Sequence, residues 1–403
     1  MKKRSEINYL SFEGGGGKGN AYLGAIYALE EAKVISFQNS KLTGSIKGIS
    51  GASAGAITAF LLGSGFSGDE IFILLSKDFN YFFDYPIMGE NVIAGFGFSE
   101  INIDDGKARF KNAPKWVVML LIGLHKTGVI GSQIDNHLAK ESPELAKKIK
   151  DKLPQYLSCL IADWGLFSGR TIQEEFFEFW LQYKIFCVRN KIAFSKEGMN
   201  EDAYAYAKEL LLTQQLNEKP CTFKEHYAIF GVELAFTSVN FKTENVEVFS
   251  YKTTPDFPIS TAVRMSMSLP LIFKPVLITT ASVYKLSLPP HFEGYWVDGG
   301  LFDNAPARVF NDVYHTILFR LGNRKEKNVL SNLIDFLRTY LKIGIMGTGS
   351  GQVNSSTVPD LAVVELNVSG LSLLKFNLEK TDLTNLSDAN KKITLDFLNN
   401  LQP

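Results

Sequence analysis

Ser53 stands at the centre of the pattern Gly51-Ala52-Ser53-Ala54-Gly55. A serine hydroxyl is a weak nucleophile, and enzymes that use one present it at a sharp turn between a strand and a helix. Residues around that turn are small, because larger side chains would collide with the neighbouring strand or helix. Gly51 and Gly55 stand at the required positions, so Ser53 is the candidate nucleophile of an acyl-transfer reaction.

A serine nucleophile also needs a base, which must come from another part of the chain. Asp298 is the candidate, because it follows an aromatic, strand-like run and precedes Gly299 and Gly300. Asp-Gly-Gly is also an ordinary turn sequence, so this motif indicates a catalytic acid only because the Ser53 turn is present in the same chain. Asp303 is a weaker candidate, more typical of a solvated or capping residue.

The histidines decide between a dyad and a triad. A Ser–Asp–His triad in the α/β-hydrolase order places a histidine after the acid. His315 is the only histidine after Asp298, and it lies in an apolar, strand-like segment. The other histidines precede the acid: His125, His137, His226 and His291. A Ser–Asp dyad is therefore favoured, and a carboxylesterase with a triad through His315 remains the alternative.

A glycine-rich run near the amino terminus supplies Gly14, Gly15, Gly16, Gly17 and Gly19 around Lys18. It fits the dinucleotide-binding pattern, but no clear acidic residue follows about 20 positions later, and no Gly-Lys-Ser/Thr is present. The other interpretation is an oxyanion hole built from unencumbered backbone N–H groups. We favour the oxyanion hole, and a nucleotide-binding module is a third hypothesis.

Two consecutive strand–turn–helix units must position these residues. Residues 7–12 predict a buried strand, which leads through the glycine run into a helix over 21–32. Residues 46–50 predict a second strand, followed by the Ser53 turn and a helix over 56–62. Repeated units of this kind predict an α/β fold.

The remaining chain changes in texture. Residues 69–222 have mostly helical periodicity and predict a helical insertion or cap. Strand patterns return at 227–237, 246–251 and 315–321, and the tail over 360–398 predicts a helix capped near Ser387 and Asp388. We therefore predict a catalytic domain over 7–310 that contains this insertion. Residues 311–403 would complete the α/β core and add terminal helices.

The order of these motifs closely resembles that of the patatin-like phospholipase family. The glycine run, the Ser53 turn and Asp298-Gly299-Gly300 match, and so do the segment 264–275 and Asn304-Ala305-Pro306. The glycine run with the following helix is especially similar to the bacterial effector and cytotoxin branch. Glu13 is a departure, because many members have aspartate there. Glu13 lies outside the predicted amide cradle, so we expect the change to have little effect.

The resemblance implies a three-layer α/β/α fold and a phospholipase A or lysophospholipase activity. Ser53 would attack the ester carbonyl, Asp298 would take the serine proton, and amides around Gly15 and Gly16 would hold the oxyanion. An acyl-enzyme would form, and water would release the fatty acid. The family needs no metal and no cofactor for this reaction.

Composition limits the partners and the compartment. Lys+Arg and Asp+Glu are both 42, so the net charge is zero, which argues against nucleic acid as a partner. The amino terminus is basic but leads into a short strand-like run, not the apolar region of a signal peptide. No apolar run reaches the length of a membrane span. We expect a cytoplasmic protein, or one secreted without a cleavable signal peptide, whose substrate is a phospholipid or another lipid ester. Peripheral membrane contact through 116–122 or 333–346 is a further hypothesis. If the protein has an effector-like role, an activating protein partner is also expected.

Overall fold

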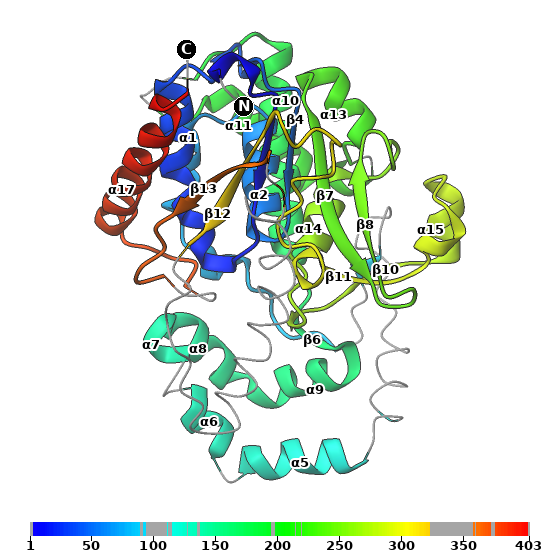
Figure 1. Cartoon of the computed structure of the whole chain (residues 1–403). Coiled ribbons are helices and arrows are strands. Elements are labelled where there is room, and N and C mark those ends of the chain that lie inside the picture. The colour runs from blue at the N-terminus through cyan, green and yellow to red at the C-terminus, as the bar shows by residue number, and fades with distance from the viewer. Residues whose placement is uncertain are drawn as a thin grey trace.

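The two predicted strand–turn–helix units near the amino terminus are present in the computed structural model (Figure 1). Strand β1 (Tyr9–Phe12) leads through the 3-10 turn η2 (Gly16–Ala21) into α1 (Tyr22–Glu31). Strand β4 (Gly48–Gly51) leads through the Ser53 turn into α2 (Ala54–Gly63). The order predicted from the sequence is confirmed for both units.

The structure describes most of the chain. The segment 333–346 and His137 lie outside the described residues, so the predictions made for them are not addressed. The described residues are 3–88, 92–93, 111, 115–126, 128–134, 138–194, 198–213, 215–218, 220–322, 358, 360–371 and 375–401.

A nine-stranded, largely parallel sheet forms the centre of the described structure. Five neighbouring strands are parallel, and the sheet then continues through antiparallel neighbours. The predicted α/β fold, a central sheet flanked by helices, is confirmed. In sheet order the strands are β13 (Ala362–Leu366), β12 (Thr316–Leu321), β1, β4, β7 (Glu233–Asn240), β11 (Gly294–Asp298), β10 (Val276–Ile278) and β5 (Val92–Ile93), with β8 (Asn245–Ser250) paired to β7.

In the described residues, helices cover one face of this sheet, and the segment that contains Pro306 and Phe310 packs on the other. On the helical face, Phe12 of β1 packs edge-on against Tyr22 of α1, at 5.0 Å between ring centroids. On the other face, Phe310 stacks on Tyr9 at 4.7 Å, and Ser50 donates a hydrogen bond to the carbonyl of Pro306. Further helices near the helical face are α3 (Gly68–Leu75), α13 (Phe223–Phe230), α14 (Ile259–Ser266) and α17 (Lys380–Asn399).

Residues 69–222 are mostly helical where the structure describes them. Helices α5 to α9 gather beyond the carboxyl ends of the parallel strands, at the bottom of Figure 1. Two short strands join this region to the rest, because β5 pairs with β10 and β6 (Gly165–Phe167) pairs with β9 (Leu271–Phe273). Its assignment as an insertion stays a prediction. The helices are α5 (Lys115–Lys126), α6 (Val129–Gln133), α7 (Ala139–Glu141), α8 (Pro143–Asp151), α9 (Leu153–Asp163), the π-helix η5 (Ile172–Glu178), α10 (Phe179–Arg189), α11 (Glu201–Leu212) and α12 (Gln215–Glu218).

Two boundaries differ from the sequence-based predictions. The strand predicted over 227–237 begins later, at Glu233, because Tyr227 to Phe230 belong to α13. This helix ends at Phe230 and is capped by Gly231, whose φ is +76°. The helix cap predicted near Ser387 is wrong, because α17 begins at Lys380 and Ser387 is buried inside it.

Short elements complete the described structure. None of the described helices combines the length and the apolar character that a bilayer span needs. The remaining elements are η1 (Arg4–Glu6), the hairpin of β2 (Ile35–Gln38) and β3 (Lys41–Gly44), η3 (Phe79–Phe82), α15 (Thr280–Lys285), η6 (Pro290–Phe292) and η7 (Gly299–Leu301).

Candidate active site

Strands β4 and β11 meet along one edge of β7, and this junction brings Ser53 and Asp298 together. Strand β4 runs parallel to β7 and ends with Gly51 opposite Phe236. Strand β11 runs antiparallel to β7 and ends with Asp298 opposite Ser238, two residues further along. The carboxyl ends of β4 and β11 therefore face each other. Ser53 follows the end of β4 by two residues, so it emerges beside Asp298.

Ser53 has the backbone geometry of a strained nucleophile turn. Its φ is +52° and its ψ is −123°, a conformation that non-glycine residues rarely adopt. The flanking glycines permit the tight crossing, because a Cβ on Gly55 would lie 2.1 Å from the carbonyl oxygen of Phe12 and one on Gly51 would lie 2.2 Å from that of Gly55. Ser53 is buried but keeps 7% of its surface exposed, so the residue is not completely closed off from solvent.

Asp298 is fully buried, and its two carboxylate oxygens differ in their surroundings. Oδ1 accepts a hydrogen bond of 2.7 Å from the amide of Gly300. Oδ2 has no hydrogen bond of ordinary length to any described residue. Burial raises the pKa of Asp298 from 3.8 to about 7, although the Ser53 hydroxyl and the Gly300 amide both lower it. A buried oxygen that lies near the serine and has a pKa near neutrality suits a general base.

Asp303 occupies a different environment. The backbone amide of Ala305 is hydrogen-bonded to its carboxylate, and burial raises its pKa from the ordinary value. Its own amide donates to the carbonyl of Gly299. This arrangement is that of a residue that shapes the turn after Asp298-Gly299-Gly300.

The described histidines lie apart from this junction or have other partners. His315 precedes β12, whose first residue, Thr316, pairs with Tyr9 at the amino end of β1. Ser53 follows the carboxyl end of the neighbouring strand β4, so the two residues belong to opposite ends of the parallel strands. Nδ1 of His315 lies 2.8 Å from the carboxylate of Asp312. His226 is buried and bonded to Ser64, and burial lowers its pKa to about 3.

The glycine run lies directly against Ser53. A Cβ on Gly14 would lie 3.0 Å from Cβ of Ser53, and one on Gly19 would lie 2.9 Å from Cβ of Ala54. The amide of Gly14 donates to the carbonyl of Asn304 at 2.9 Å, and Nδ2 of Asn304 donates to the carbonyl of Gly14 at 3.1 Å. Asn304 therefore anchors this end of the run and occupies the Gly14 amide.

The amides after Gly14 are the better candidates for an oxyanion hole. Gly15 precedes η2, and Gly16 and Gly17 begin it, with φ +54° at Gly16. The first amides of a helical turn have no partner within that turn. Ala54 begins α2 immediately after the serine, so its amide is a further candidate donor, at the amino end of the helix predicted to follow Ser53.

Glu13 supports the start of the glycine run, a role that the sequence did not indicate. Its side chain is buried, and Oε2 accepts a hydrogen bond of 2.8 Å from the amide of Leu321 at the end of β12. Its backbone carbonyl accepts a hydrogen bond from the hydroxyl of Tyr22. The residue thus ties the loop to β12 and α1 without joining the amide cradle.

The segment 264–274 holds both catalytic candidates by their backbones. Oγ of Ser266 accepts a hydrogen bond of 3.1 Å from the amide of Ser53. The carbonyl of Ser268 accepts one of 3.0 Å from the amide of Asp298. The sequence pointed to this segment only through its likeness to a family motif and gave no role to either serine.

Arg264 braces this segment from inside the protein. Its guanidinium is fully buried and donates to Oγ of Ser268 and to the carbonyls of Ser168 and Lys274. Burial lowers its pKa to about 10, so it remains charged at neutral pH. One side chain therefore connects the helical region at Ser168 to the residues that hold Ser53 and Asp298.

We predict that Arg264→Met lowers kcat between about tenfold and a hundredfold while changing KM for a short soluble ester little. Methionine leaves three buried acceptors without donors, and a displacement of about 1 Å at a catalytic group can cost a hundredfold in rate. Arg264→Lys should recover part of the loss. Arg170→Met is the matched control, because Arg170 is partly exposed and pairs with Glu174. An unchanged kcat in folded Arg264→Met would contradict the bracing role.

A narrow, mostly apolar cavity of about 90 Å³ opens at Ser53. Helices α1, α2 and α3 supply one part of its wall, and the segment 267–273 supplies another. The apolar wall suits a hydrocarbon group, and the small volume has room for only a short part of a ligand beside Ser53. Apolar residues that line it are Leu23, Ile26, Ile57, Leu61, Ile71, Leu75, Phe79, Met267, Leu269, Ile272, Phe273 and Phe376.

Comparison with known proteins gives one family and several distant relatives. Residues 10–311 match the family model described as patatin-like phospholipase. A probable lipid hydrolase of Invertebrate iridescent virus 6 is 29% identical over 88 residues, which are 22% of this chain and 26% of the relative. An uncharacterized protein of Acanthamoeba polyphaga mimivirus is 28% identical over 198 residues, 46% and 59% of the two chains. The matches thus span less than two thirds of these relatives.

Two solved structures are also similar. VipD from Legionella pneumophila is 16% identical with a TM-score of 0.45, over 98% of this chain and 67% of that protein. ExoU from the type III secretion system of Pseudomonas aeruginosa, solved in complex with SpcU, is 18% identical with a TM-score of 0.37, over 98% and 53%.

Proposed function

Because the chain belongs to the patatin-like phospholipase family, we propose that it is a serine esterase of the phospholipase A or lysophospholipase type, with a Ser53–Asp298 dyad. The observation that carries this proposal is the junction of β4 and β11. It sets a strained serine beside a buried carboxylate, at the mouth of an apolar cavity.

In the first half of the reaction, Oγ of Ser53 attacks the ester carbonyl and its proton passes to Oδ2 of Asp298. The amides of Gly15, Gly16 and Ala54 hold the oxyanion that forms. When the tetrahedral intermediate collapses, the carbon–oxygen bond to the alcohol breaks. The leaving alkoxide takes the proton from Asp298, so the alcohol departs neutral and the acyl group stays on Ser53.

In the second half, Asp298 removes a proton from water and the hydroxide attacks the acyl-enzyme. Collapse of this intermediate returns the proton to Oγ of Ser53 and releases a fatty acid. The raised pKa of Asp298 suits both halves, because the same oxygen must accept and return a proton near neutral pH. In this scheme Gly299 and Gly300 hold the carboxylate, and Gly51 and Gly55 hold the serine.

The position of His315 supports the dyad over the triad. A triad needs the histidine within hydrogen-bond reach of the serine, but His315 belongs to the amino end of the parallel strands and is bonded to Asp312. The substrate is proposed to be a phospholipid or a related lipid ester, because the cavity at Ser53 is lined mainly by hydrocarbon side chains.

Peripheral contact with membranes and an activating protein partner are further proposals. So is the compartment, which is either the cytoplasm or, after secretion without a cleavable signal peptide, the outside of the cell. Helix α5 supports membrane contact most directly, since Met119 on it is 73% exposed.

The proposed function is tested by following the acyl group. The full chain is incubated with a mixture of phospholipids and lysophospholipids, and the released products are identified by mass spectrometry. Rapid quenching and proteolysis should then yield the peptide that contains Ser53 with a fatty-acyl mass added. Fatty-acid release without acylation of Ser53 would reject the covalent mechanism. The absence of any release, both by the chain alone and with a cell extract added as a source of an activating protein, would reject the function.

A further inference from the structure

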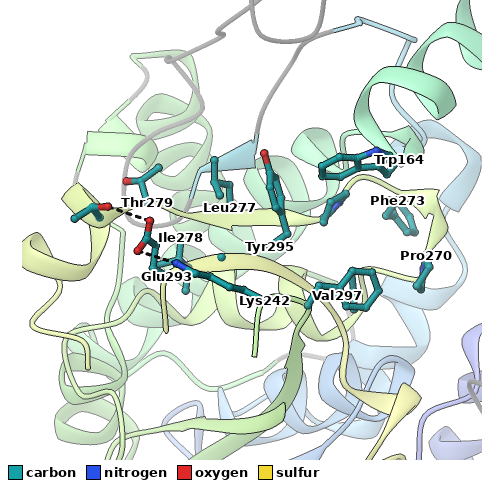
Figure 2. Close-up of a pocket in the computed structure, with 14 residues that line it drawn as sticks. Trp164, Lys242, Pro270, Phe273, Leu277, Ile278, Thr279, Glu293, Tyr295 and Val297 are labelled. Atoms are coloured by element: carbon teal, nitrogen blue, oxygen red, sulfur yellow. Dashed lines mark hydrogen bonds and ion pairs between the residues drawn. The ribbon is translucent and has the colours of Figure 1, made fainter. Parts of the chain in front are cut away.

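A second cavity, of about 610 Å³, lies between the β10–β11 pair and the end of α9 (Figure 2). Leu277 and Tyr295 are cross-strand partners, so their side chains leave the sheet on the same side. Trp164 packs edge-on against Tyr295, at 4.8 Å between ring centroids. The wall formed by these side chains is apolar, and neither Ser53 nor Asp298 lines this cavity.

The two cavities share a wall. Phe273 lines both of them, and Phe273 is buried in β9. Leu269 and Ile272 line the cavity at Ser53, while Pro270, within the same short segment, lines the second cavity. Val297 also lines the second cavity and directly precedes Asp298. Because consecutive side chains leave opposite faces of a strand, Val297 and Asp298 face different sides of β11, and the two cavities adjoin at the segment 269–273.

The second cavity has one charged end. Nζ of Lys242 lies 3.1 Å from Oε2 of Glu293, and Thr280 donates a hydrogen bond to Oε1 of the same carboxylate. Figure 2 shows Glu293, Lys242 and Thr279 on one side and Trp164, Phe273 and Pro270 on the other. Both charged side chains are largely exposed. The occupant must therefore be apolar along most of its length and end near water.

We propose that this cavity holds the second hydrocarbon chain of a two-chain lipid ester whose first chain lies in the cavity at Ser53. This inference rests on the proposed function. In such a lipid the second chain is tethered a few bonds from the reacting carbonyl, so it must lie in a neighbouring space. The volume lies within the range of small-molecule sites, and the apolar part of the wall favours a hydrocarbon over a polar group. A single-chain ester would leave this cavity empty.

Leu277→Trp tests the proposal, because the larger ring fills the second cavity and leaves the cavity at Ser53 untouched. The variant and the wild type are assayed on diacyl phosphatidylcholine and on lysophosphatidylcholine in the same detergent micelles. We expect kcat/KM for the diacyl lipid to fall about tenfold, which corresponds to about 1.4 kcal/mol. The rate on the single-chain lipid should not change. Tyr284→Trp is the control, since Tyr284 is 80% exposed outside this cavity.

An equal loss on both lipids, or no loss on either, would overturn the proposal. Thr279→Trp at the edge of the cavity is the second variant and replaces Leu277→Trp if that protein does not fold. Binding of a dialkyl ether phospholipid, which has no ester, is measured on the same proteins. The wild type could bind this ether more tightly than Leu277→Trp does and yet hydrolyse neither ester. That result would support the assignment of the second cavity to a hydrocarbon chain and would reject the proposed function. Equal binding of the ether by both proteins would overturn the cavity assignment.

Discussion

Ser53→Ala is expected to lower the rate of fatty-acid release by about 10⁵-fold, because the acyl-enzyme cannot form without the hydroxyl. Asp298→Asn is expected to lower the rate by about 10⁴-fold, because the amide keeps the shape of the carboxylate but cannot accept the proton. Asparagine can still accept the hydrogen bond that the amide of Gly300 gives to Oδ1. The turn should therefore persist in the variant, and the loss should be chemical.

The double variant Ser53→Ala/Asp298→Asn shows whether the two residues act together in one step or contribute to the rate independently. If Ser53 and Asp298 act in one step, the double variant should be no slower than Ser53→Ala alone. Initial rates on one soluble ester, together with thermal unfolding of each protein, supply the measurement. Asp303→Asn is the matched control, because Asp303 is a half-buried acid of the same region and burial raises its pKa as well. Additive losses in the double variant, or a loss of 10⁴-fold in Asp303→Asn, would contradict the dyad.

Local sequence patterns predicted the parts of the site that depend on local geometry. The Ser53 turn needs glycine two residues before and two residues after the serine, and a Cβ at either position would collide with backbone. Such a requirement is visible in the sequence because no other residue meets it. Asp298 was predicted from the two glycines that follow it, and Gly299 packs just as closely, with a Cβ there 2.1 Å from the carbonyl of Thr237.

Other parts depend on contacts between distant segments, and no local pattern carries them. The junction of β4 and β11 on one edge of β7 joins three segments that are far apart in the chain. The same is true of the hydrogen bond from Gly14 to Asn304, which occupies an amide that the sequence counted as a possible oxyanion donor. Arg264 was noted only as the first residue of the segment that resembles a family motif, and only its burial beside Ser168 and Lys274 gives it a role.

The errors at element boundaries also have physical causes. Tyr227 to Phe230 are aromatic and β-branched enough to resemble a strand, but Thr222 and Glu225 form a capping box that starts a helix before them. Ser387 resembled a helix cap, since serine and aspartate favour that position. It lies instead where α17 crosses α1, and a Cβ on Gly24 would lie 2.2 Å from its carbonyl oxygen. Packing between the helices overrides the local preference.

The titration of Asp298 should control both activity and stability. The carboxylate is the base, and burial raises its pKa to about 7. We expect kcat/KM to fall about tenfold for each pH unit below 7, because the protonated acid cannot accept the serine proton. Measurement of kcat/KM for a neutral, soluble ester between pH 5 and pH 9 gives this pKa for the free enzyme. A flat profile down to pH 5 would contradict Asp298 as the base.

Stability should move in the opposite direction over the same pH range. The folded-state pKa lies above the unfolded value near 3.8, so between pH 4 and pH 7 the folded protein holds a proton that the unfolded chain releases. The contribution of this group to the free energy of unfolding is therefore fully present below pH 4 and is lost as the pH rises, by about 1.4 kcal/mol per unit. Asp298→Asn does not titrate and escapes this loss. Denaturant unfolding of both proteins at pH 5 and pH 8 should show the stability of the variant, relative to wild type, rising by about 3 kcal/mol. A constant difference between the two proteins would mean that Asp298 is already ionised in the folded protein at pH 5.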